Sequence, residues 1–260
     1  EFPEPLAAPK APADEFEPLE QVLDLPTLTL DESQMKGLRK VAKDVDASLN
    51  DLFIREMILA AHAWNAQHAP ESAKGRFRVV VPMNMRAPGD ELLPACNVVG
   101  MAFIDRYPSL HKTPQTLLST IRRGMNLYKK TRLGMSWSHT LAIVGWIPGL
   151  VEKLALTHRA AQTTVVSNMG KVFDQIPLPR REGKIAVGDM TLEVVESAPP
   201  VRPYLRAVLS IVSYGKKAAL SFNYDRTAWT PEVAQEFLGV FSKQIEATLE
   251  GSREHVALMR

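Results

Sequence analysis

Cysteine is nearly absent from this sequence: Cys96 is the single one among 260 residues. One cysteine excludes an intrachain disulfide and argues against a cysteine-based metal site. Because disulfide-free proteins are typical of reducing compartments, we expect a cytoplasmic protein. The sequence begins Glu1-Phe2-Pro3, without an initiator Met, a basic n-region or an apolar h-region. We therefore expect no signal peptide.

A strong charge of one sign is also missing. The 31 basic and 29 acidic residues leave a net charge of +2, and both signs are interspersed along the chain. No bulk field therefore selects nucleic acid as a partner.

Long apolar runs are missing as well. The longest, Leu141 to Val151, contains Pro148 and is followed by Glu152. It is shorter than the roughly 20 residues that a spanning helix needs, so we expect no transmembrane segment. Instead, residues 137–157 are predicted to form a buried or cleft-lining helix. That helix could serve as an apolar wall for a lipid-like substrate or make a peripheral lipid contact.

Self-sufficient catalytic motifs are absent too. The six histidines form no His-Glu-x-x-His motif, no serine lies in Gly-x-Ser-x-Gly, and no glycine-rich loop ends in Lys-Ser or Lys-Thr. The sequence thus predicts no catalytic residue, no metal site and no tightly bound cofactor in this chain.

Prolines concentrate at the start of the chain, among Glu and Ala, which is the composition of a linker; they are Pro3, Pro5, Pro9, Pro12, Pro18 and Pro26. We expect residues 1–27 to be a linker or crossover, residues 28–250 to be one domain, and residues 251–260 to be a tail.

Apolar periodicity within that domain predicts both helices and strands. Helices are expected over residues 31–45, 49–64, 114–130 and 231–249, the second opened by a Ser48–Asp51 capping box. Strands are expected over residues 77–83, 98–104 and 163–166, with hairpins over 184–195 and 205–224. The sequence therefore predicts an α/β fold, with a mixed sheet of about six strands and helices packed on it.

Polar residues at strand ends are the candidate binding groups. Asn84 and Arg86 follow a buried strand, at the position where α/β clefts form. Asn97 and Asn168 could hydrogen-bond a substrate carbonyl or a pantetheine amide. Structural roles remain open for all four: Arg86 could fix a loop, and the asparagines could cap turns.

A second group of candidates is basic and lies in and after one helix: Arg122, Arg123, Lys129, Lys130 and Arg132. These side chains could contact a coenzyme A phosphate or an acidic carrier protein. A solvated helix face explains them equally.

Several motifs occur in an order that resembles a known family: residues 38–64, then VPMNMR (81–86), NVVGMAFI (97–104), VVSNMG (165–170) and LSFNYD (220–225) before a last helix. The order is similar to the C-terminal half of the chloramphenicol acetyltransferase-like superfamily. That superfamily includes nonribosomal peptide synthetase condensation domains, alcohol acetyltransferases and wax ester synthases. The resemblance covers about residues 28–250.

The resemblance implies one half of the two-subdomain CoA-dependent acyltransferase fold, with a substrate tunnel between the halves. It implies a coenzyme A or phosphopantetheine thioester as co-substrate, and acyl-CoA or an acyl carrier protein as partner. The general base would belong to a His-His-x-x-x-Asp motif in an N-terminal subdomain that is missing here. By resemblance, the segment Ser167-Asn168-Met169-Gly170 and the segment Asn97-Val98-Val99-Gly100 would line the tunnel or its crossover.

Two functions remain open from the sequence. The chain is either the tunnel wall of an acyltransferase that transfers an acyl group to an alcohol or amine, or a non-catalytic binding or carrier-docking module of the same fold.

Overall fold

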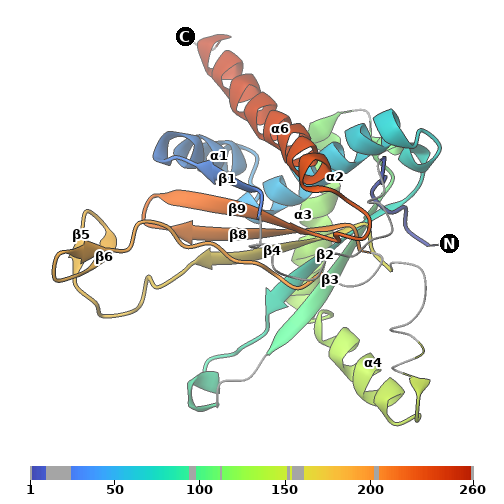
Figure 1. Ribbon diagram of the computed structural model, residues 1–260, viewed down its shortest axis with the longest axis horizontal. Coiled ribbons are helices and arrows are strands. Elements are labelled where there is room, and N and C mark those ends of the chain that lie inside the picture. The colour runs from blue at the N-terminus through green and yellow to red at the C-terminus, as the bar shows by residue number, and fades with distance from the viewer. Residues whose placement is uncertain are drawn as a thin grey trace.

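A six-stranded mixed sheet forms the centre of the molecule (Figure 1). The computed structural model describes residues 2–9, 25–93, 98–111, 113–150, 153, 161–201 and 205–258. Along the sheet the strands run in the order β1 (Thr27–Leu30), β9 (Lys217–Tyr224), β8 (Ala207–Tyr214), β4 (Thr164–Lys171), β2 (Phe77–Asn84) and β3 (Val99–Arg106). The central pairs β8–β4 and β4–β2 are parallel, and the outer pairs are antiparallel.

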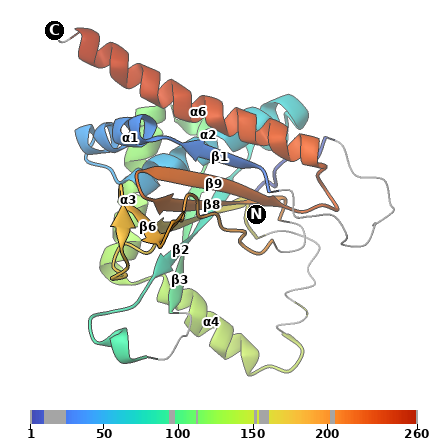
Figure 2. The same ribbon diagram turned by 60° about the vertical axis from the view of Figure 1, so that its left-hand side comes forward.

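Four helices share one core with the sheet: α1 (Glu32–Asp44), α2 (Leu49–His68), α3 (Pro114–Thr131) and α6 (Pro231–Leu258). Helix α2 contacts the other three and also β2 and β4. It is apolar on nearly every side, which is typical of a central helix. The strand side chains in this core alternate along each strand, such as Val79 and Val81 on β2. Figure 2 shows α1 and α6 at one end of the molecule and α4 (Met135–Gly145) at the other.

The predicted α/β fold with its mixed sheet is confirmed, and so is the start of α2. The Ser48 side chain accepts a hydrogen bond from the Asp51 amide, and the Asp51 carboxylate accepts one from the Ser48 amide. These are the two bonds of a capping box. Helix α1 starts with a capping box of its own, formed by Asp31 and Gln34.

Several boundaries differ from the prediction. Strand β4 continues through Ser167 and Asn168 to Lys171, beyond the predicted end at Val166. Strand β1 was not predicted; it starts at Thr27, the last residue of the predicted linker, and pairs with β9. Helix α6 continues to Leu258, so the predicted tail is largely helical. The pattern of apolar residues predicts where a helix or strand lies more accurately than where it begins or ends.

Both predicted hairpins are present. Val187 pairs with Met190 around Gly188-Asp189, and Tyr214 pairs with Lys217 around Gly215. Strands β5 (Arg180–Arg181), β6 (Lys184–Val187) and β7 (Met190–Thr191) form a separate three-stranded sheet. This small sheet, which we call the β-arm, projects from the end of the main sheet (Figure 1). Three short 3-10 helices complete the fold: η1 (Ser72–Lys74), η2 (Asp90–Leu92) and η3 (Pro108–Leu110).

The start of the chain is packed against the core, which its linker-like composition did not predict. Leu6 is buried, and the side chain of Asn65 donates to the Pro5 carbonyl and accepts from the Ala7 amide. The indole N–H groups of Trp64 and Trp229 both donate to the Ala7 carbonyl, at 3.0 Å. Residues 10–24 of the predicted linker lie outside the described residues.

The helix predicted over residues 137–157 is wrong in its burial. Helix α4 covers Met135 to Gly145 and has no buried residue. It contacts β3, where Trp137 meets Phe103 edge to face with ring centroids 5.6 Å apart. Residues 146–149, which follow it, are exposed, Trp146 by 85%. Apolar composition predicted burial, whereas one face of the helix has no neighbour among the described residues. Residues 151, 152 and 154–160 lie outside the described part.

Candidate functional site

A pocket of about 300 Å³ lies where β2 ends and β3 begins, beside the middle of β4, the neighbour of β2 in the sheet. We call it the strand-end pocket; it is lined by Pro82, Met83, Asn84, Arg86, Val98, Val99, Ser167 and Asn168. Because β2 and β4 are parallel neighbours, their carboxyl ends reach the same edge of the sheet. Ligands bind at this edge in many α/β proteins.

Asn168 is held on two sides within this pocket. Its Nδ2 donates to Oδ1 of Asn50, in the first turn of α2, at 3.3 Å. Its Oδ1 accepts from the Gly170 amide at 2.9 Å. The register of β4 against β8 shifts between Asn168 and Lys171, so the strand bulges here. The side chain therefore fixes the bulge against α2 while it lines the pocket.

Ser167, the residue before it, is half-buried; its backbone pairs with β8, and its hydroxyl forms no hydrogen bond with the described residues. A serine hydroxyl is both a donor and an acceptor. Its placement in the pocket therefore leaves one uncommitted polar group for a ligand.

Asn84 and Arg86 lie on the opposite side of the pocket. Asn84 is exposed, and its Oδ1 accepts from the Arg86 amide at 3.0 Å, an Asx turn that leaves the strand. Arg86 Nη1 donates to the Asp90 carbonyl at 3.1 Å, and the Asp90 carboxylate accepts from the Ala87 amide at 2.7 Å. Arg86 thus fixes the following loop, as one predicted alternative had it, and lines the pocket as well.

The pocket therefore collects four of the seven predicted binding residues, namely Asn84, Arg86, Ser167 and Asn168. Gly100 and Gly170 are not among its lining residues. Gly100 faces the loop before α4, where an added Cβ would come within 2.7 Å of the Gly134 carbonyl carbon. Gly170 has a φ of +67°, a conformation that favours glycine at the bulge. Asn97 lies outside the described residues.

Sequence reasoning missed Asn50, which orients Asn168. Its signal was its position between the two capping-box residues at the start of α2, which places its side chain at the end of a buried helix. Val98 and Val99 belong to the 97–100 segment, and Met83 to the VPMNMR motif, that the resemblance singled out; all three line the strand-end pocket.

No histidine is among the residues that line the strand-end pocket. His62 lies on α2, and burial lowers the pKa of its imidazole. Burial and the nearby Arg106 lower the pKa of His111, which follows η3. Within the described residues, no three His, Cys, Asp or Glu side chains gather in a way that could hold a metal ion.

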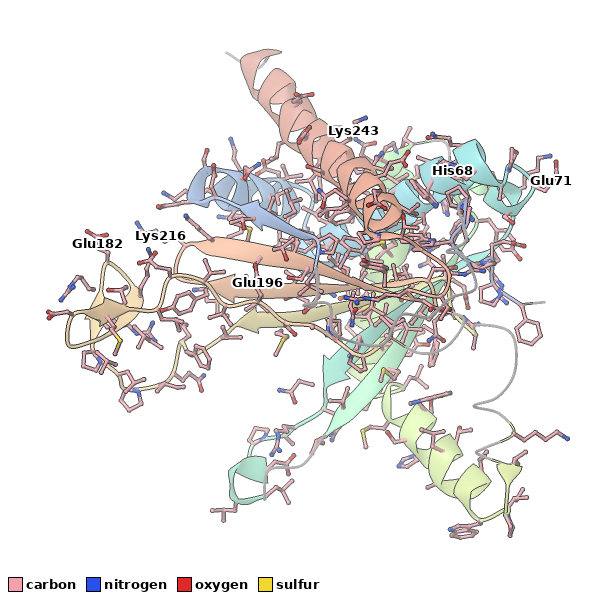
Figure 3. All side chains as sticks on the ribbon, viewed as in Figure 1. His68, Glu71, Glu182, Glu196, Lys216 and Lys243 are labelled. Atoms are coloured by element: carbon pink, nitrogen blue, oxygen red, sulfur yellow. The ribbon has the colours of Figure 1, made fainter. Side chains whose placement is uncertain are left out.

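Several ionisable side chains lie on the periphery of the molecule and are not among the residues that line the pocket. Figure 3 labels Glu182 on the β-arm, Lys216 at the β8–β9 turn and Lys243 on α6. Of the predicted basic cluster, Arg122 forms an ion pair with Asp46, and Lys129 and Lys130 are exposed at the end of α3. Arg132 Nη2, however, donates to the Met85 carbonyl at 3.0 Å, between Asn84 and Arg86, so the cluster reaches residues next to the strand-end pocket although none of its members lines it.

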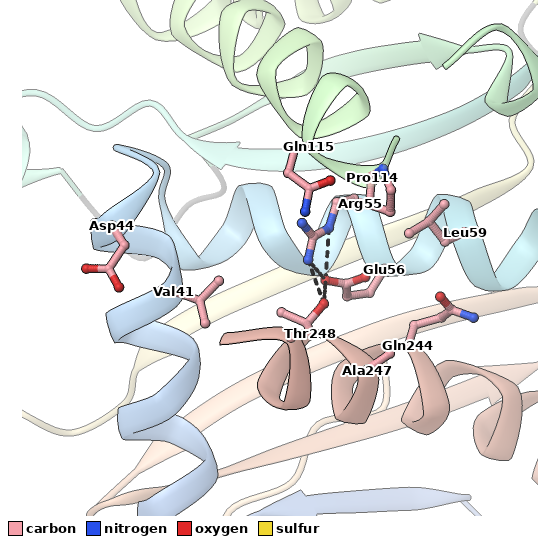
Figure 4. Close-up of a pocket in the computed structure, with 11 residues that line it drawn as sticks. Val41, Asp44, Arg55, Glu56, Leu59, Pro114, Gln115, Gln244, Ala247 and Thr248 are labelled. Atoms are coloured by element: carbon pink, nitrogen blue, oxygen red, sulfur yellow. Dashed lines mark hydrogen bonds and ion pairs between the residues drawn. The ribbon is translucent and has the colours of Figure 1, made fainter. Parts of the chain in front are cut away.

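A second cavity, of about 420 Å³, lies among the four helices of the core (Figure 4). Its walls include Arg55 and Glu56, which are adjacent buried residues of α2, and Thr248 of α6. Arg55 Nε donates to Glu56 Oε1 at 3.0 Å, and the Thr248 hydroxyl donates to the same oxygen at 2.9 Å. Burial raises the pKa of the Glu56 carboxyl, against the opposing effect of Arg55. This buried pair ties α2 to α6 and was not predicted from the sequence.

No family model and no curated protein matches this sequence. Solved structures do match by fold. The cyclization-docking bidomain of the nonribosomal peptide synthetase EpoB from Sorangium cellulosum superposes with a TM-score of 0.63 at 12% identity, over 96% of this chain and 46% of that one. The nonribosomal peptide synthetase FmoA3 gives a TM-score of 0.60 at 14% identity, over 96% of this chain and 23% of that one.

The epimerization domain from the third module of tyrocidine synthetase B gives a TM-score of 0.56 at 15% identity, over 93% of this chain and 51% of that one. The chain thus spans between about a quarter and a half of these solved chains. At such identities the likeness establishes fold. The structural neighbours are condensation-type domains of nonribosomal peptide synthetases, in agreement with the predicted resemblance to a condensation-domain-like C-terminal half.

Proposed function

We propose that this chain is the C-terminal half of a condensation-like acyltransferase, and that its strand-end pocket forms part of the substrate tunnel wall. In this proposal an acyl group passes from a coenzyme A or phosphopantetheine thioester to an alcohol or amine. The observation that carries it is the meeting of Asn84 and Arg86 with Ser167 and Asn168, some 80 residues apart in sequence, at one edge of the sheet.

The chemistry of the pocket suits positioning rather than proton transfer. Its apolar side chains, Met83, Val98 and Val99, offer a surface for an acyl or pantetheine chain. The Ser167 hydroxyl offers a donor to a carbonyl or amide in the same place. Small-molecule sites commonly combine such an apolar lining with a few fixed polar groups.

The base that deprotonates the acceptor belongs, in this proposal, to a His-His-x-x-x-Asp motif of an N-terminal half. General-base catalysis needs a group of suitable pKa within hydrogen-bond reach of the attacking hydroxyl or amine. The described lining of the strand-end pocket holds no carboxylate or imidazole. The N-terminal half and the thioester carrier are accordingly the partners that we propose, in a cytoplasmic setting.

The experiment uses the longest gene product that contains this chain. Transfer from acyl-coenzyme A and acyl-carrier-protein donors to alcohol and amine acceptors is measured for the unaltered protein, for Ser167→Ala and for Asn168→Ala. We expect each variant to lose about tenfold or more in kcat/KM, as the loss of one or two hydrogen bonds to a bound substrate would produce.

Asn126→Ala is the matched control, because Asn126 is exposed on α3 and does not line the pocket. Its activity should be that of the unaltered protein. Absence of any transfer by the unaltered protein, with retained binding of coenzyme A or carrier protein by calorimetry, would instead support a non-catalytic docking module. A longer gene product without an upstream His-His-x-x-x-Asp motif would overturn the catalytic proposal.

A further inference from the structure

Helix α4 and the residues after it expose a continuous apolar surface. Ile143 lies in the last turn of α4, Trp146 follows as its C-cap and Ile147 comes next; all three are exposed, Trp146 the most. We call these three residues the α4 face. The opposite side of the helix contacts β3 through Trp137. Exposed apolar side chains gathered in this way mark an interaction surface.

Charged residues are distributed unevenly along the sequence that contains this surface. Residues 106–171 contain ten Lys or Arg and one acidic residue, Glu152, whereas the rest of the chain contains 21 basic and 28 acidic residues. Within that stretch, no Asp, Glu, Lys or Arg occurs from Leu133 to Val151. The α4 face therefore lies within an uncharged stretch of the sequence, and that stretch is flanked by a strong excess of basic residues.

Exposed lysines flank the α4 face in sequence on both sides. Lys129 and Lys130 end α3, just before α4, and Lys153 follows it. None of the three forms an ion pair with a carboxylate of the described residues. They are thus available to anionic groups outside the molecule.

A second apolar protrusion lies at the same end of the molecule. The loop after β2 carries η2, with Leu92 exposed by 95%. Figures 1 and 2 both show η2 and α4 at the lower end of the view, away from α1 and α6. Two apolar protrusions at one end suit a flat partner better than a small ligand.

We propose that this end of the molecule binds the surface of an anionic lipid bilayer, with the α4 face inserted among the headgroups. A helix that lies in the interface places Trp and aliphatic side chains in the acyl boundary, and nearby Lys side chains meet anionic headgroups. The helix lies on the membrane rather than crossing it, since no described helix is long and apolar enough to span a bilayer. The proposal does not depend on acyl transfer.

The test is sedimentation of the longest gene product containing this chain with vesicles of phosphatidylcholine, with and without phosphatidylglycerol. We expect binding to the anionic vesicles, weakened by added salt. Trp146→Ser combined with Ile147→Ser should lower the partition coefficient about tenfold or more, and Lys129→Gln with Lys130→Gln should lower it by a similar factor.

Val187→Ser combined with Met190→Ser is the matched control, because these β-arm residues are also exposed and apolar. The control variant should bind vesicles normally, and circular dichroism checks that every variant is folded. Equal binding of the Trp146 double variant and the unaltered protein would overturn the proposal. Absence of vesicle binding by the unaltered protein would overturn it as well. If the Lys129 and Lys130 variants then bound an acidic carrier protein more weakly, these lysines would belong to a carrier-docking surface instead. Transfer between water-soluble substrates, measured without vesicles, should be unchanged in all of them.

Discussion

Asn168, on a central strand, and Asn50, in the first turn of the central helix, are joined side chain to side chain across 118 residues of sequence. The bond connects the bulge of β4 to the N-terminus of α2 at the strand-end pocket. The shape of that pocket therefore depends on a polar contact between the sheet and the helix layer, and not on strand pairing alone.

We expect Asn50→Ala to lower the free energy of unfolding by about 1 kcal/mol, the typical contribution of one hydrogen bond, and Asn168→Ala, which also removes the acceptor of the Gly170 amide, to lower it by about 2 kcal/mol. The double variant should lose less than the sum of the two, because both single variants remove the same bond. Urea unfolding of the four proteins measures this coupling. Fully additive losses would show that the two side chains act independently.

The buried Arg55–Glu56 pair leads to a second expectation. Glu56→Ala removes the partner of a buried guanidinium, and we expect it to cost about 3–5 kcal/mol of stability. Thr248→Ala leaves both charges in place but removes the hydroxyl that donates to Glu56 Oε1 and accepts from Arg55 Nη2, and it should cost about 1.5–3 kcal/mol. Thermal or urea unfolding gives both values. A Glu56→Ala protein as stable as Thr248→Ala would mean that water reaches the charge of Arg55.

The pH dependence of stability provides a separate test of Glu56. Burial raises the pKa of this carboxyl above its ordinary value of 4.5, so the folded protein binds its proton more tightly than the unfolded chain does. The resulting stabilisation is fully present below pH 4.5 and is lost as the pH rises through the folded pKa. Glu56→Gln cannot titrate at this position. We therefore expect the free energy of unfolding of the unaltered protein to fall relative to Glu56→Gln as the pH increases above 4.5.

Substitution by alanine at two glycines should change the stability of the protein in opposite directions. Gly100→Ala places a Cβ 2.7 Å from the backbone of Gly134, so the loop before α4 has to move; we expect a loss of about 1–3 kcal/mol. Gly239 lies within α6 and would meet no atom within 4 Å. Gly239→Ala should therefore gain up to about 1 kcal/mol from helix propensity. Calorimetric melting temperatures of the two variants should move apart; a shared direction would contradict the close approach at Gly100.

Local pattern was enough to predict most of the fold. Alternating and three-to-four spacing located the strands and helices, and the residues at strand ends located the pocket, because β2 and β4 are parallel neighbours. The misses have physical causes. Strand β1 is short and its pairing with β9 is non-local. The exposure of α4 could not be predicted from composition, because an apolar run has the same composition whether it is buried in the core or exposed on the surface. The anchoring of residues 2–9 depends on single polar side chains far away in sequence.

That anchoring gives a final test, centred on Asn65. This buried side chain holds the first segment with two backbone hydrogen bonds, one from the Ala7 amide and one to the Pro5 carbonyl, both at 2.8 Å. We expect Asn65→Ala to cost about 2 kcal/mol and to make residues 2–9 cleavable in limited proteolysis. Asn126→Ala, on the exposed face of α3, should change neither property.

Removing residues 1–9 altogether should have an optical consequence as well. The Ala7 carbonyl accepts from the indole N–H groups of Trp64 and Trp229, whose ring centroids are 5.7 Å apart. Without the segment both N–H groups lose their acceptor and gain contact with water, since buried indoles normally keep a partner. The tryptophan emission of the truncated protein should therefore shift to longer wavelength. An unshifted spectrum, in a protein that still unfolds cooperatively, would mean that the first segment does not cover these two rings in solution.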